Sequence, residues 1–192
     1  MGAKEEFIAI YREYIKREGS NELLDYIMST DFFTAPASSK FHNHFRGGLC
    51  EHSINVYKRL KKLSLMEPEL YQTYSEETFA IIGLLHDLCK ANFYIEDYRN
   101  VKEDGVWVSK PYYKISEALP FGHGEKSVYL IMKFMKLTDE EALAINWHMG
   151  GYDERANKDD RSITKVFYNH PLAFLTHIAD SMATYLDEAI DD

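Results

Sequence analysis

Residues 80–90 place a histidine and an aspartate, His86 and Asp87, side by side within an apolar run. Apolar positions cover nearly the whole circumference of the expected helix, so we expect it to be buried rather than half exposed. An ionised aspartate in a buried helix costs free energy unless it is paired or bound to a cation. Adjacent helical residues point about 100° apart, so both side chains reach one ion only where the helix faces a cavity. We therefore interpret this pair as one half of a metal site.

The other half is sought among polar residues that lie near helix ends or on apolar helix faces. Together with the first pair they come from five separate predicted helices: His52, His86, Asp87, His123, His148 and Asp180. Four imidazoles and two carboxylates that converge from a helical bundle form a nitrogen and oxygen ligand set for divalent metal ions. A bundle can build such a site because facing helices project side chains into one core.

This ordered set resembles the H…HD…D signature of the HD-domain metal-dependent phosphohydrolase superfamily, and His123 and His148 match the additional histidines of its dinuclear members. Residues 41–53 (FHNHFRGGLCEHS) resemble a run in the HD module of bacterial 3′–5′ exoribonucleases. Residues 84–90 (LLHDLCK) resemble the LLHDIGK run of the superfamily. The resemblance extends from residue 41 to about residue 185.

The chain departs from the pattern of these relatives in two places. The exoribonucleases carry an oligonucleotide-binding β-barrel before the HD module, and the first 40 residues here do not accommodate one. Met149 follows His148 where several relatives have a second consecutive histidine, which puts an additional metal ligand in doubt but leaves the role of His148 in place.

The resemblance implies one or two divalent ions, with Mn, Fe, Co, Ni, Zn and Mg all compatible with the ligand set. One ion would be held by His52, His86, Asp87 and Asp180. A second would be held by Asp87, acting as a bridge, with His123 and His148. A metal-activated water would then attack phosphorus in line. Asp87 and Lys90 are the expected catalytic residues, and Lys90, Lys126 and Arg46 are the candidate phosphate contacts.

Simpler interpretations remain open for several of these residues. His123 could cap a helix, and His148 could be a helix-terminal cation that the helix dipole favours. Lys90, Lys126 and Arg46 could equally be exposed charges, and the loop histidines His42 and His44 could face either the substrate or solvent. Aromatic residues between positions 94 and 113 could stack on a nucleobase or pair across strands.

These side chains must be positioned by a fold that the periodicity predicts to be all-α, a helical bundle of the HD type with one small β-hairpin over about residues 93–115. The 192 residues suit a single domain. We expect a helical N-terminal extension over residues 1–40 and an HD core over residues 41–185. Apolar spacing predicts helices over residues 3–18, about 50–64, from Ser75 to the HD pair, and from Pro171 to about 189. Asp104-Gly105 predicts the hairpin turn.

Composition limits the partners and the location. The formal net charge is −9, from 22 basic and 31 acidic residues, which argues against binding of long nucleic acid but allows a local phosphate site. The first residues contain no apolar core of the signal-peptide type, and no segment approaches 18 uninterrupted apolar residues, so we expect no membrane partner. Two cysteines, Cys50 and Cys89, do not make a disulfide framework, and a reduced cytoplasmic setting is expected.

The leading hypothesis is a metal-dependent phosphohydrolase that acts on a small phosphorylated substrate, a nucleotide or a short oligonucleotide. The alternative from another class is a catalytically silent HD-type module that senses or binds a nucleotide. A third hypothesis is an iron-dependent oxygenase. The sequence does not predict the oligomeric state.

Overall fold

The most deeply buried helix is α5 (Glu76–Leu85), in which every residue from Thr78 to Leu85 is buried. Ser75 caps it, because the Ser75 hydroxyl accepts a hydrogen bond from the Thr78 backbone N–H at 3.1 Å. The helix packs against α3 (Gly48–Met66), α1 (Ala3–Tyr14) and α7 (Asp139–Asn146). The prediction of a buried helix that leads into the HD pair is therefore confirmed.

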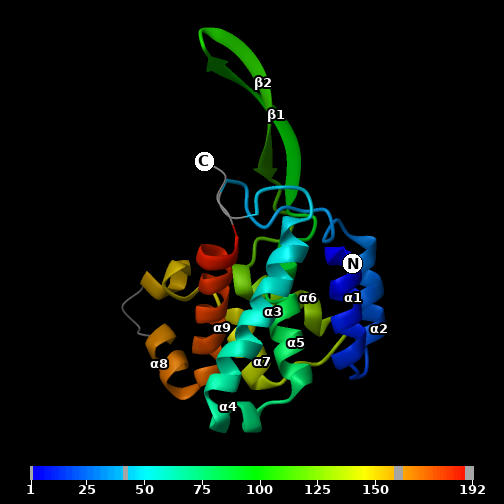
Figure 1. Ribbon diagram of the computed structural model, residues 1–192, viewed down its shortest axis with the longest axis vertical. Helices are drawn as coiled ribbons and strands as arrows, with labels where there is room; N and C mark the ends of the chain where they lie inside the picture. The colour runs from blue at the N-terminus through cyan, green and yellow to red at the C-terminus, as the bar shows by residue number, and fades with distance from the viewer. Residues whose placement is uncertain (1, 41–42, 158–161, 189–192) are drawn as a thin grey trace.

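The computed structural model describes residues 2–40, 43–157 and 162–188, and in this part of the chain helices form a body from which one hairpin projects (Figure 1). The remaining helices are α2 (Ser20–Ser29), α4 (Pro68–Thr73), α6 (His123–Met132), α8 (Ser162–Asn169) and α9 (Pro171–Met182). Short 3₁₀ turns span Leu88–Lys90, Gly150–Tyr152 and Glu154–Asn157, and a π-helical turn, η4, spans Ala183–Asp187. The predicted fold class, all-α with one small hairpin, is confirmed.

The first helix is shorter than the sequence predicts, because α1 ends at Tyr14 and Ile15 adopts an extended conformation. The apolar pattern continues past that point because Ile15 remains buried in the core. Phe7 and Tyr11 from α1 and Leu23 and Ile27 from α2 belong to the same hydrophobic cluster as α3, α5 and α9. The first two helices therefore cover part of the core that supports the candidate site.

Helices α3 and α5 approach closely at Gly83, where an added Cβ would lie 2.4 Å from the Tyr57 Cα. This approach matters for the site because α3 carries His52, and His86 directly follows α5. The Nε2 atoms of the two histidines lie 3.3 Å apart. A larger residue at position 83 must push the two helices apart.

We expect Gly83→Ala to destabilise the protein by about 2 kcal/mol. Overpacking against backbone costs roughly 3 kcal/mol at the upper end of the usual range, and the better helix propensity of alanine returns about 1 kcal/mol. Urea unfolding followed by circular dichroism measures the difference. Gly151→Ala is the matched control, because a Cβ there meets nothing within 4 Å. Equal stability of the two variants would contradict the close-packing argument.

The hairpin pairs β1 (Tyr94–Glu103) with β2 (Val106–Ile115) in an antiparallel register that runs from Tyr94 opposite Ile115 to Glu103 opposite Val106. Asp104 and Gly105 both have positive φ, as a two-residue type I′ turn requires, so the predicted turn is confirmed. Most hairpin side chains are exposed, and the strands extend away from the helices (Figure 1). The hairpin therefore adds surface near the candidate site and little to the core.

Across the described residues, no helix has the combination of length and apolar character that crossing a bilayer requires.

Candidate metal centre

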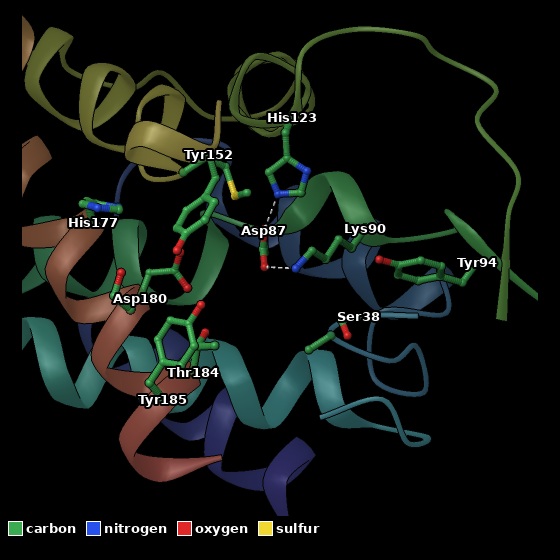
Figure 2. Close-up of a pocket in the computed structure, with 13 residues that line it drawn as sticks. Ser38, Asp87, Lys90, Tyr94, His123, Tyr152, His177, Asp180, Thr184 and Tyr185 are labelled. Atoms are coloured by element: carbon green, nitrogen blue, oxygen red, sulfur yellow. Dashed lines mark hydrogen bonds and ion pairs between the residues drawn. The ribbon is translucent and has the colours of Figure 1, made fainter. Parts of the chain in front are cut away.

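The HD pair lies where α5 ends, because α5 stops at Leu85 and the chain tightens into the 3₁₀ turn Leu88–Lys90. Asp87, at the junction, has φ −103° and ψ 19°. The change of helical geometry allows His86 and Asp87 to face the same space although they are adjacent in sequence. It also brings the Lys90 Nζ to 2.7 Å from Asp87 Oδ2 (Figure 2).

A first group of ligand atoms surrounds Asp87 Oδ2. The Nε2 atoms of His52 and His86 lie 3.5 and 3.6 Å from this oxygen. Asp180, on α9, places its Oδ1 3.1 Å from His52 Nε2. The four residues that the resemblance assigns to one ion are thus brought together by α3, α9 and the end of α5.

A second group surrounds the other oxygen of the same carboxylate, Asp87 Oδ1. His123, the first residue of α6, places its Nε2 2.7 Å from this oxygen. His148, just after α7, places its Nε2 at 3.4 Å. Within each triad, His52–His86–Asp87 and Asp87–His123–His148, the potential ligand atoms lie within 4.8 Å of one another.

The hydrogen bonds of the histidines fit metal ligation. The Nδ1 atoms of His86 and His148 lie 3.0 and 2.7 Å from the carbonyl oxygens of Gly83 and Ile145. A carbonyl oxygen only accepts, so Nδ1 carries the proton and the Nε2 lone pair faces the cluster, as in histidines that bind metals. In the described part of the chain, the buried Nε2 of His148 has no hydrogen-bond partner. A metal ion would satisfy that atom, so the residues present fit a divalent cation.

The charges of the cluster point the same way. Burial lowers the pKa of His86 to about 3, so this imidazole stays neutral. Burial raises the pKa of Asp87, but Lys90, His86 and the hydrogen bond from His123 outweigh it and hold that pKa well below its usual value. Burial lowers the pKa of His52, but Asp180 and Glu188 outweigh it and raise that pKa to about 9. Protonated His52 thus balances carboxylate charge. Metal binding displaces an imidazole proton, so a divalent cation would replace this proton and balance the same charge.

A cavity of about 570 Å³ opens beside the cluster, a volume suited to a small-molecule ligand. Asp87, Lys90, His123 and Asp180 line its inner part. Three tyrosines, Tyr94, Tyr152 and Tyr185, stand around it (Figure 2). The sequence pointed to Tyr94 only as a hairpin aromatic and missed Tyr152 and Tyr185, because no motif distinguishes them from other surface tyrosines.

Two of the predicted phosphate contacts lie away from this cavity. Lys126 is buried on α6, and its ammonium faces Glu117 at 2.8 and 3.0 Å. Arg46 is exposed in the loop before α3 and lines a different cavity beside the hairpin. Of the three candidates, Lys90 alone lines the cavity at the cluster. His44 lines the second cavity, whereas His42 lies outside the described residues.

Two residues outside the predicted ligand set, His177 and Glu188, contact the backbone or the ring of a candidate ligand. His177 places its Nδ1 2.8 Å from the backbone carbonyl oxygen of His148. Glu188, which sequence reasoning missed, places a carboxylate oxygen 2.9 Å from His52 Nδ1. A regular α-helix would turn position 188 about 80° from position 180, so helical spacing gave no signal. The π-helical turn η4 lies between them, and its Glu188 N–H to Ala183 C=O bond closes a wider ring.

We expect Glu188→Ala to weaken metal binding roughly 10- to 100-fold, the usual effect of removing a partner behind a ligating histidine. The reason is that His52 loses the carboxylate that orients its ring and raises its basicity. Competition with a chelating dye measures the affinity. Asp187→Ala is the control, because Asp187 pairs with Arg59 on the surface. Equal affinities in the two variants would contradict the role given to Glu188.

A helical body that gathers four histidines and two carboxylates, with one aspartate between two histidine pairs, defines a protein with a candidate dinuclear metal site. The chain belongs to the HD domain family, whose model matches residues 49–184. It is 39% identical over 74 residues to a dihydroneopterin 2′,3′-cyclic phosphate phosphodiesterase of Methanocaldococcus jannaschii. That alignment covers 38% of this chain and 28% of the relative. No solved structure matches significantly.

Proposed function

We propose that this chain is a metal-dependent phosphohydrolase that cleaves a phosphate ester of a nucleotide or a short oligonucleotide. The observation that carries the proposal is that the two oxygens of one carboxylate face different pairs of histidines. Asp87 Oδ1 faces His123 and His148, whereas Asp87 Oδ2 faces His52 and His86. A carboxylate placed in this way is suited to bridge two ions, and two-ion sites serve phosphoryl transfer.

His52, His86, Asp87 and Asp180 would hold one ion, and Asp87, His123 and His148 would hold the other. Bound ions of this kind polarise phosphoryl oxygens and lower the pKa of water. Lys90 supplies a fixed positive charge at the same place, because Asp87 keeps its ammonium protonated within the buried wall of the cavity. That charge would neutralise a phosphoryl oxygen as negative charge develops on it. Asp87 and Lys90 are therefore the proposed catalytic residues.

Several finer points belong to the same proposal. The name of the Methanocaldococcus jannaschii relative supports a diester rather than a monoester as the substrate. The ligand set suits Mn, Fe, Co, Ni, Zn or Mg, and availability often decides which ion occupies such a site. We propose the HD core over residues 41–185 with residues 1–40 as a helical extension. Both cysteines are free and buried, which supports a reducing, cytoplasmic location.

Metal analysis of the purified protein, combined with a turnover screen, tests the proposal. The screen uses bis(p-nitrophenyl) phosphate, p-nitrophenyl phosphate, cyclic nucleotides and short oligonucleotides, each with several divalent metals. We expect bound metal and hydrolysis of a diester. Bound nucleotide without hydrolysis of any ester, across all metals, would favour the sensing module instead. Mixed-valent iron with oxygen uptake would identify an oxygenase.

A further inference from the structure

A second cavity, of about 710 Å³, lies between the loop that precedes α3 and the hairpin. The loop contributes Lys40, His44 and Arg46 to its lining, and the hairpin contributes Glu96, Arg99 and Tyr113. Neither the candidate metal ligands nor Lys90 lines this cavity. It is therefore a separate concave surface for which the hydrolytic centre gives no explanation.

The cavity concentrates positive charge in a protein of formal net charge −9. Lys40, Arg46 and Arg99 face a single carboxylate in the lining, that of Glu96. Within the described residues none of these three cations forms an ion pair, although Arg99 lies over the Tyr112 ring at 5.5 Å. By contrast, Arg17, Arg59 and Arg155 are each paired with an acid. Cations left unpaired in a cavity are suited to an anion, and guanidinium suits the oxygens of phosphate.

The two cavities are neighbours. Ser38 lines the cavity at the metal cluster, and the next residue, Ser39, lines the basic cavity. Tyr94 lines the first cavity and Glu96 the second, and residues two apart on a strand share a face about 7 Å apart. One small molecule would therefore be long enough to place an anion in the basic cavity and another group at the metal cluster.

We propose that the basic cavity binds a second phosphate of the substrate while the first phosphate is at the metal cluster. This inference rests on the proposed function and narrows the substrate to a phosphodiester that carries at least one further phosphate. The second phosphate could be the terminal group of a short oligonucleotide or of a phosphorylated cyclic nucleotide. Arg46 and Lys40 bind it, and the Tyr113 ring forms part of the wall.

Matched ligand pairs test this proposal through binding rather than turnover. One pair is the dinucleotide ApA with and without a 5′-phosphate, and the other is adenosine 2′,3′-cyclic phosphate with and without a 5′-phosphate. Calorimetry on the 192-residue chain carrying Lys90→Gln, which keeps all six candidate metal ligands but removes a proposed catalytic charge, measures the affinity of each with hydrolysis slowed. We expect the extra phosphate to strengthen binding about tenfold or more, as a charge-assisted hydrogen bond does. The pair with the larger gain identifies the source of the phosphate.

The double variant Lys40→Gln/Arg46→Gln should abolish that gain. For the dinucleotide it should also reduce the slope of log affinity against log salt by about 0.7 for each lost phosphate contact. Lys114→Gln removes a charge from the same hairpin outside both cavities, and it should keep the gain. Thermal melting checks that the variants are folded, and Arg46→Glu provides a second variant that should lose the gain.

Equal binding of both members of each pair, or a gain that survives the double variant, would overturn the proposal. If no phosphate ester were hydrolysed but the gain in affinity from the extra phosphate depended on Lys40 and Arg46, the phosphate site in the basic cavity would be supported and the hydrolase assignment would be wrong. If esters were hydrolysed without such a gain, the hydrolase would stand and the second phosphate site would fall.

Discussion

Asp87→Ala should lose both metal retention and turnover. In the part of the chain that the structure describes, this carboxylate lies between the two histidine pairs, with His123 Nε2 2.7 Å from Oδ1 and Lys90 Nζ 2.7 Å from Oδ2. Losing a direct ligand should cost more than the roughly 10- to 100-fold that follows from removing a partner behind a ligand. Elemental analysis after gel filtration measures retention, and the diester assay measures turnover.

Asp25→Ala provides the control for this experiment, because Asp25 is an exposed carboxylate on α2. Circular dichroism should confirm that Asp87→Ala is folded, since the substitution leaves the buried ammonium of Lys90 without its partner. An Asp87→Ala protein with full metal content and full activity would show that the bridging assignment is wrong.

Glu141→Ala should destabilise the fold by about 3 kcal/mol, which for a protein of this size lowers the melting temperature by roughly 6–12 °C. Its carboxylate is fully buried and accepts hydrogen bonds from both terminal nitrogens of Arg17, at 2.7 and 2.9 Å. It also accepts from the Thr78 hydroxyl at 2.9 Å and the Thr138 backbone N–H at 2.9 Å. One side chain thus joins the segment after α1 to the starts of α5 and α7.

The lower end of the usual 3–5 kcal/mol range applies here, because the Arg17 side chain is 21% exposed and water can partly solvate it after the change. Differential scanning calorimetry measures the effect. Asp139→Ala removes the same charge from an exposed position two residues away and should stay within about 0.5 kcal/mol of the wild type. A Glu141→Ala protein as stable as the Asp139→Ala control would contradict this account.

Local signals predicted much of what the structure contains. Asp104-Gly105 predicted the hairpin turn because both positions need positive φ, and Ser75 predicted a helix start through its capping hydroxyl. The candidate ligands were found because a histidine or an aspartate on an apolar helix face needs a partner. The structure brings the six side chains together, although their roles stay a prediction.

Features that depend on tertiary packing could not be predicted from the sequence. Thr138 and Glu141 form a capping box at the start of α7, but nothing local in the sequence shows that Arg17, more than a hundred positions earlier, pairs with that glutamate. Lys126 follows His123 by three residues, yet packing turns its ammonium to Glu117. Glu188 was hidden because a π-helical turn changes the spacing that an α-helix would give.

The projecting hairpin can vary in sequence independently of the residues that would hold the metal ions. All six candidate metal ligands come from the helical body or its connecting turns, whereas the hairpin forms one wall of the neighbouring basic cavity. Substitutions on its exposed strands should change stability by only about 0.5 kcal/mol or less. Selection can therefore alter which molecules this protein accepts while the residues around Asp87 stay unchanged, so descendants of one ancestor could diversify in substrate without rebuilding their chemistry.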